Sequence, residues 1–185
     1  MLRSESGGEQ TYLTNVVAAW ALAVADRVNE RTAEVAEHGP SAAAVLTTLR
    51  FTPGLPMDRL AATVGLTGPG AVQLLNRLEA AGLVERVAGE DRRRRHPQLT
   101  TSGQAMVERV LAVRRSVVET AMAGMSAADR AAAGRAAEAM VLALSGTRMA
   151  ADRICRLCDE RACPDERCPS ESALPPQQRM GTACP

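Results

Sequence analysis

The chain contains no lysine and very few aromatic side chains, which make up 2% of its 185 residues. Apart from two histidines, its basic residues are all arginine, and the formal net charge is only +1. This balance excludes a strong attraction of the whole chain to nucleic acid, so any such attraction must be local. Ala, Leu and Val supply most of the apolar content, and because Ala and Leu are strong helix formers, we expect a mostly helical protein.

Long apolar runs are also missing. No segment approaches the roughly 18 consecutive apolar residues that a bilayer-spanning helix needs. The first ten residues, MLRSESGGEQ, lack the apolar core of a signal peptide. These two absences predict a cytoplasmic protein that makes no contact with a membrane.

Motifs for catalysis are absent as well. The sequence has neither a phosphate-binding loop of the Walker type nor an HExxH motif. Its two histidines, His38 and His96, lie far along the chain from the cysteines, so we do not expect a Cys/His nucleophile pair. The Cys-x2-Cys at residue 155 lacks the βαβ context of a thioredoxin-like enzyme. We therefore predict no enzymatic activity and no catalytic residues.

Apolar periodicity and helix-breaking residues divide the chain into elements. Residues 1–9 are polar and glycine-rich and are predicted to be disordered. A tight connection is expected over residues 67–70, where two glycines flank a proline. The expected elements, in order, are helices over residues 10–37, 41–51, 57–64 and 71–81, strands over 83–87 and 96–100, and helices over 102–123 and 126–144.

Two short helices with a glycine-containing turn, followed by two strands, indicate a helix-turn-helix over residues 57–82 and a wing over 83–100. The turn between the strands carries four consecutive arginines: Arg92, Arg93, Arg94 and Arg95. Such a run is typical of a solvated surface, but beside a helix-turn-helix it can contact phosphates or a narrow minor groove. Asp91 is expected to pair with one of these arginines and to shape the turn.

This segment resembles the winged-helix regulators of the MarR family. The shared signature reads LAxxxGLT…LLNRLEAAGLVERxxxxxDRRxRxxxLTxxG, and the resemblance covers roughly residues 10–148. It implies a homodimer on a pseudo-palindromic site in double-stranded DNA, usually a repressor relieved by a small-molecule effector or an oxidant. It also implies a ligand pocket between the DNA-binding and dimer regions, which Trp20, Met57 and Met106 could line unless they belong to the core. The matching residues are Leu60, Ala61, Gly65, Leu66, Thr67, Arg77, Leu78, Glu79, Gly82, Leu83, Val84, Asp91, Arg93, Leu99, Thr100 and Gly103.

The second short helix is the expected recognition helix. By the rules of direct readout, Gln73 could pair with adenine and Val72 could contact a thymine methyl group. Arg77 is expected to contact phosphate, although Asn76 and Arg77 could equally form a solvated helix face. The family usually has Ser, Thr or Arg at the start of this face, so we expect shape readout and the wing to carry more of the specificity here. The predicted DNA-binding residues of the helix-turn-helix are Thr67, Gly70, Val72, Gln73, Asn76 and Arg77.

The apolar stripes of the three long helices exceed what a small winged helix can bury internally. Helices with surplus apolar faces bury them against a partner, which favours a homodimer. A larger monomeric helical core is the alternative.

All five cysteines lie beyond residue 150, and four of them are spaced as Cys155-x2-Cys158-x4-Cys163-x4-Cys168. Four thiolates this close in sequence could hold a structural zinc ion or an iron–sulfur cluster. They could instead form reversible disulfides, because the neighbouring arginines favour thiolates, or the tail could be inert. Cys184 stands apart and is expected to be a spare or resolving thiol.

The sequence therefore predicts a mostly α-helical protein with a small β-hairpin. Residues 10–148 form a winged-helix domain with dimerisation helices, and residues 149–185 form a cysteine-rich tail. The favoured function is that of a sequence-specific DNA-binding transcription regulator, acting as a repressor, that metal or redox state at the tail could modulate. The alternative is a metal- or redox-binding adaptor that uses the winged helix for protein contacts.

Overall fold

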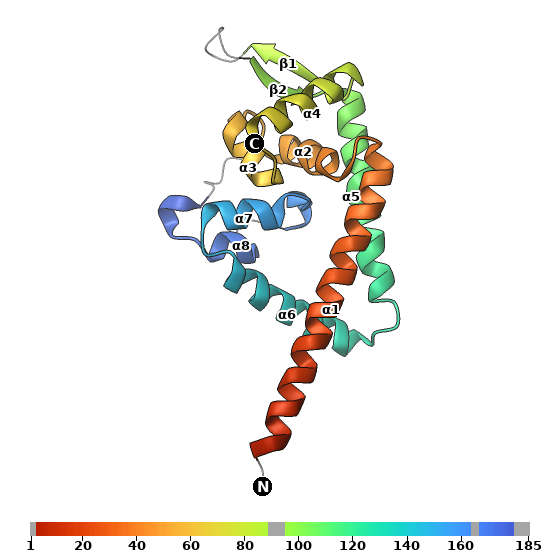
Figure 1. Ribbon diagram of the computed structural model, residues 1–185, viewed down its shortest axis with the longest axis vertical. Coiled ribbons are helices and arrows are strands. Elements are labelled where there is room, and N and C mark those ends of the chain that lie inside the picture. Colours follow the sequence, from red (N-terminus) through yellow and green to blue (C-terminus); the bar gives the residue numbers. More distant parts are fainter. Residues whose placement is uncertain (1–2, 89–94, 164–166, 180–185) are drawn as a thin grey trace.

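A computed structural model describes residues 3–88, 95–163 and 167–179. It is mostly helical and includes a hairpin of two strands, as predicted (Figure 1). The sequence predictions for Asp91, Arg92–Arg94 and Cys184 lie outside the described residues. In chain order the elements are α1 (Arg3–Ala36), α2 (Pro40–Phe51), α3 (Met57–Val64), α4 (Gly68–Ala80), β1 (Val84–Ala88), β2 (Arg95–Leu99), α5 (Thr101–Ala121), α6 (Ala127–Leu144), α7 (Arg148–Cys155), η1 (Glu160–Ala162), α8 (Pro169–Ser172) and η3 (Pro176–Gln178).

Helix α2 lies at the centre of the core. Its residues 42–49 are all buried, because the sequence offers no charged side chain there before Arg50. A helix that is apolar on every side is stable only when other elements surround it. Around α2 the fully buried side chains include Leu60, Leu74, Leu78, Val107 and Val110, from α3, α4 and α5.

The helix-turn-helix is formed by α3 and α4. Gly65 and Gly82 follow the two helices with φ angles of 74° and 70°, in the left-handed region that favours glycine, as predicted. Helix α4 begins at Gly68, so the prediction of a tight connection over residues 67–70 is wrong. The Thr67 hydroxyl accepts a hydrogen bond from the Gly70 amide, and proline is tolerated in a first helical turn because no amide donor is needed there.

The wing is an antiparallel pair of strands in which Val84 lies opposite Leu99 and Arg86 lies opposite Pro97. Its base is fixed to α5 at Gly103. A Cβ atom on Gly103 would lie 2.0 Å from the carbonyl oxygen of Leu83, so the two backbones can approach this closely only at a glycine. Thr100 adds a second connection, because its hydroxyl donates to the carbonyl of Gly82 and accepts from the Gly103 amide.

Helix α1 is longer than the sequence predicts. It begins at Arg3, so the prediction of disorder over residues 1–9 is wrong from residue 3 onward. The glycines in this segment lower helix propensity, but each retains the amide donor that a helix needs, so they do not end it. The C-terminal half of α1 lies along α5, and its N-terminal half projects beyond the rest of the molecule (Figure 1).

Residues 148–163 and 167–179 are folded, although the sequence pattern indicated only a tail. Helix α7 lies against α3, and α8 lies against α6 and α7 (Figure 1). Leu157 joins the main hydrophobic core, and Ala151 and Leu174 are buried. The segment is therefore part of the folded domain. Within the ranges that the structure describes, no helix is both long and apolar enough to cross a membrane.

Candidate nucleic-acid interface

The outer face of α4 carries side chains that were predicted from the sequence to contact DNA. Val72, Gln73, Asn76 and Arg77 are exposed, while Gly70 is half-buried. With 3.6 residues per turn, positions i, i+1, i+4 and i+5 share one face of a helix. The opposite face is buried and consists of Ala71, Leu74, Leu75 and Leu78. Helix α4 thus presents a continuous exposed face of polar and methyl-bearing side chains.

Asn76 is connected to the wing, a contact that the sequence analysis missed. Its side-chain oxygen accepts a hydrogen bond of 2.5 Å from Arg86 Nη2 on β1. The same guanidinium lies 3.4 Å from the Glu79 carboxylate one turn later on α4. Arg86 therefore fixes the position of the hairpin relative to α4. The signature contains Glu79 and Arg86, but only the strand register could have shown that they meet.

The hairpin lies at the same end of the molecule as α4 (Figure 1). Arg95, the last residue of the predicted arginine run, begins β2 opposite Ala88. Thr67 also lies here, with its hydroxyl engaged in capping α4. The structure thus brings the predicted helix residues together on one surface and places Arg95, the last residue of the arginine run, at the start of β2 in the hairpin.

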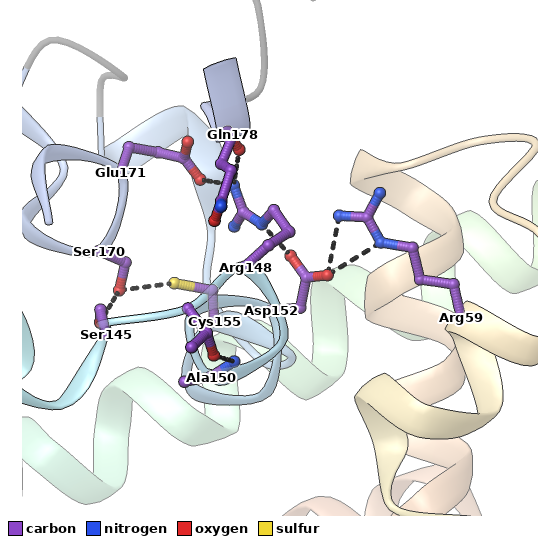
Figure 2. Close-up of polar contacts among 10 residues, drawn as sticks. Arg59, Ser145, Arg148, Ala150, Asp152, Cys155, Ser170, Glu171 and Gln178 are labelled. Carbon is purple, nitrogen blue, oxygen red and sulfur yellow. Dashed lines mark hydrogen bonds and ion pairs between the residues drawn. The ribbon is translucent and has the colours of Figure 1, made fainter. Parts of the chain in front are cut away.

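A second polar cluster joins α7 to the helix-turn-helix (Figure 2). The Asp152 carboxylate accepts hydrogen bonds from Arg59 Nε and Nη2 on α3, at 3.0 and 2.9 Å. Its other oxygen accepts from Arg148 Nε at 2.7 Å, and Arg148 also donates to Glu171 of α8 at 2.6 Å. The side chain of Asp152 is only 9% exposed. Arg153 extends over Gly65, where a Cβ atom would lie 3.1 Å from its Nη2.

Charge complementarity stabilises this cluster. Burial by itself would lower the pKa of Arg148, but the hydrogen bond to Glu171 and the charges of Asp152 and Glu171 raise it above its ordinary value. The guanidinium of Arg148 is therefore held in the charged form by its two carboxylate partners.

Arg161 anchors the segment at a second point. It donates to both oxygens of Glu108 on α5, at 3.0 and 2.9 Å, and to Asp159 at 2.9 Å. Its guanidinium lies 5.9 Å from the ring centroid of Phe51. The hydrogen bond from Arg161 lowers the pKa of the Asp159 carboxyl. These contacts are exposed, so they position residues 156–163 more than they stabilise the fold.

The four cysteines of the segment lie in different surroundings. Cys155 lies 3.4 Å from the hydroxyl of Ser170, which lies 3.1 Å from that of Ser145 (Figure 2). Cys158 Sγ lies 4.0 Å from Nη2 of Arg114 on α5. Cys168 is buried, and Cys155, Cys158 and Cys163 are half-buried. In the described part of the chain, no group of three or more His, Cys, Asp or Glu side chains is arranged to hold a metal ion.

The Cys155 and Cys158 thiols influence one another directly. The hydrogen bond between them and burial raise the pKa of the Cys155 thiol. The same hydrogen bond lowers the pKa of Cys158 against the effect of burial, with a further contribution from the charge of Arg114.

A cavity of about 40 Å³ lies between α7 and the helices α2 and α3. Cys155, Arg59 and Asp152 are part of its wall, together with Thr48 and Thr63. The hydroxyls of both threonines are buried and have no hydrogen-bond partner among the described residues. Of the three residues that could line an effector pocket, Trp20 is 48% exposed, Met106 belongs to the core and Met57 packs against the core.

Known proteins share part of this arrangement. A family model described as MarR family matches residues 39–95. No curated protein sequence matches the chain. The predicted resemblance in residues 39–95 is confirmed, and it spans α2, the helix-turn-helix and the first part of the wing.

Solved structures share the fold at low sequence identity. The YusO protein of Bacillus subtilis is 19% identical with a TM-score of 0.62, and the match covers 72% of this chain and 95% of that one. Wild-type MarR of E. coli is 18% identical with a TM-score of 0.55, covering 66% and 95%. A MepR mutant of S. aureus, bound to an oligodeoxyribonucleotide, is 22% identical with a TM-score of 0.52, covering 73% and 97%. More than a quarter of this chain therefore has no counterpart in these structures.

Proposed function

We propose, from the premise that residues 39–95 form a MarR-family domain within a winged-helix fold, that this chain is a sequence-specific DNA-binding transcription regulator. The exposed face of α4 carries the proposal. It combines an amide at Gln73, a methyl-bearing side chain at Val72 and a cation at Arg77, which are the groups that read adenine, thymine and phosphate. The DNA-bound MepR structure, which shares this fold, supports the same assignment.

In the proposed complex, α4 lies in the major groove and the hairpin lies against the backbone or the minor groove. Arg86 has a positioning role, because it connects Asn76 and Glu79 to β1 and so sets the angle between helix and wing. The run Arg92–Arg95, assigned from the sequence, supplies the local positive charge that the whole chain lacks.

The proposed functional unit is a homodimer. Helix α1 leaves Leu13, Val16 and Trp20 exposed, and within α6, which the structure describes in full, no side chain is buried. Two copies joined through these helices would present two α4 helices to successive major grooves of a pseudo-palindromic site. On such a site the protein would act as a repressor by occupying promoter DNA.

Selection from a random duplex library, followed by affinity measurements at several salt concentrations, tests the proposal. Replacing Arg77 with Ala should weaken binding to all sequences alike and reduce the slope of log affinity against log salt by about 1. Gln73→Ala should instead relax the preference at one base pair, costing roughly 1–3 kcal/mol there. Arg115→Ala, which removes a surface pair with Glu119 on α5, is the matched control and should change neither.

Two results would contradict this function. An Arg93→Ala, Arg94→Ala variant that binds the selected duplex as tightly as wild type would refute the role of the wing. Failure to bind any duplex at low salt would favour the alternative, a metal- or redox-binding adaptor that uses the winged helix for protein contacts.

A further inference from the structure

Cys155 and Cys158 are placed so that a disulfide can form between them. The Cys158 amide donates to the Cys155 carbonyl over 2.7 Å, which closes a turn at the end of α7. Side chains three residues apart on such a turn have Cβ atoms about 5–6 Å apart. A disulfide needs Cβ atoms about 3.5–4.5 Å apart, so forming one here requires the turn to close by about 1–2 Å. Both thiols are free and half-buried.

The surroundings of the two sulfurs suit them to different parts in one reaction. The Arg114 guanidinium near Cys158 stabilises a thiolate there and can donate to a departing oxygen. Cys155 Sγ lies 3.4 Å from the Ser170 hydroxyl, and the backbone of Cys155 is hydrogen-bonded to that of Cys158. Since the described residues form no cluster of three or more metal-ligating side chains, the geometry favours a thiol pair over a site of four thiolates.

We propose that Cys155 and Cys158 are a redox-active dithiol whose oxidant is a small hydroperoxide, with hydrogen peroxide as its simplest member. The Cys158 thiolate attacks one peroxide oxygen, the O–O bond breaks, and Cys158 becomes a sulfenic acid. The hydroxide that leaves takes the proton of Cys155 and becomes water. The Cys155 thiolate then attacks the Cys158 sulfur, so that an S–S bond forms and the S–O bond breaks. The second hydroxide takes a proton from solvent, and two thiols and one peroxide have become one disulfide and two waters.

The disulfide would act on the helix-turn-helix through α7. Asp152, which binds Arg59 of α3, lies one turn before Cys155 on the same helix. Turning Cys155 toward Cys158 removes its contact with Ser170, which links α7 to α8 and to Ser145. The packing of α7 against α2 and α3 is weak at this point, because the Thr48 and Thr63 hydroxyls in the cavity wall are without partners among the described residues. Oxidation therefore loosens α7 from α3 and lowers DNA affinity.

Peptide mapping of the full chain tests the chemistry without any variant. Arg156 separates the two cysteines, so trypsin places Cys155 in peptide 154–156 and Cys158 in peptide 157–161, while Cys163, Cys168 and Cys184 fall in three other peptides. Reduced protein treated with one equivalent of hydrogen peroxide should yield peptides 154–156 and 157–161 joined by a disulfide. A different linked pair, or one zinc ion per reduced chain that protects all four thiols from alkylation, overturns the proposal.

Single variants then separate the two thiols. Cys155→Ser should stop at a sulfenic acid on Cys158 that a dimedone probe labels, and Cys158→Ser should give neither product. Cys184→Ser is the matched control and should form the disulfide as wild type does. A dimedone adduct on Cys155 in the Cys158→Ser protein would reverse the assigned order and refute the role of Arg114.

The regulatory step rests on the proposed DNA-binding function, and DNA affinity before and after oxidation tests it. Peroxide should lower the affinity of wild type for the selected duplex about fivefold or more, and reductant should restore it. Cys158→Ser should bind equally before and after peroxide. If the reduced protein binds no duplex, the proposed function fails while the peptide map still decides the dithiol. If the disulfide forms and DNA affinity is unchanged, only the regulatory step fails.

Discussion

Gly103 shows how one residue without a side chain positions the candidate DNA-binding surface. It lies in the first turn of α5, directly against the carbonyl of Leu83, where the chain leaves α4 and enters β1. Thr100 closes the same corner with two hydrogen bonds, to Gly82 and from Gly103. Helix α4, the hairpin and α5 therefore meet at a point with no room for another atom.

Gly103→Ala should destabilise the protein strongly. The added Cβ would lie 2.0 Å from the Leu83 carbonyl oxygen, and both atoms belong to backbone that cannot simply rotate away. We expect the free energy of unfolding in urea to fall by about 3 kcal/mol. Gly134→Ala on α6 is the matched control, because its Cβ would meet nothing within 4 Å and should stabilise the helix by up to about 1 kcal/mol. Equal effects of the two substitutions would contradict this account of the corner.

At the scale of elements, α7 is the part of the structure that connects the cysteine segment to the helix-turn-helix. It reaches α3 through Asp152 and Arg59, α8 through Arg148 and Glu171, and the α3–α4 turn through Arg153. The Asp152 carboxylate is shared by two guanidiniums, so its loss would leave Arg59 without this partner and Arg148 with Glu171 alone. This makes Asp152 the residue on which the docking of α7 most depends.

Asp152→Asn should loosen α7 more than the rest of the molecule. We expect a loss of about 2 kcal/mol in unfolding free energy, less than for a fully buried pair, because the Arg59 side chain is 36% exposed. Hydrogen exchange should speed up in residues 148–155 while α5 stays protected. Asp58→Asn, an exposed acid in the first turn of α3, is the control and should cost less than about 1 kcal/mol. Unchanged exchange in α7 would show that other contacts hold this helix.

The elements differ in how far local signals determine them. Helix α3 occupies Met57–Val64 as predicted, because Pro56 and Gly65 mark its ends and the apolar positions lie on one side. Helix α4 begins earlier than predicted, since the cap at Thr67 outweighs the two glycines and the proline that suggested a turn. Helix α7 could not be found from periodicity, because its stability comes from ion pairs with residues far along the chain. The exposed face of α4 was predictable from helical periodicity. Its connection to Arg86 was not, because that contact depends on the strand register.

At the scale of the whole molecule, the proposed DNA-binding and dimerisation surfaces lie in different parts of the structure. The helix-turn-helix and the wing lie at one end, and the projecting half of α1 lies at the other (Figure 1). The tail segment lies between them against α3 and α6. A change in the position of α7 is therefore next to the DNA-binding helices and to α6, one of the two helices proposed to join the chains. In a homodimer, such a change would alter the spacing of the two α4 helices as well as their support.

Replacing both Leu13 and Trp20 with Glu should convert the proposed dimer into a monomer. These side chains are 53% and 48% exposed and share one face of α1 with Val16, at positions i, i+3 and i+7. Buried against a second chain, two carboxylates on each α1 would lose hydration without gaining a partner. Light scattering should give twice the chain mass of 19.5 kDa for wild type and the chain mass for the variant. The Ala18→Glu variant, changed at an exposed position on the opposite face of α1, should remain dimeric.

The monomer should keep the helix-turn-helix intact, so it would still bind a half-site but with the affinity of one module. A wild-type protein that is monomeric at micromolar concentration would refute the interface and leave the apolar face of α1 to another partner.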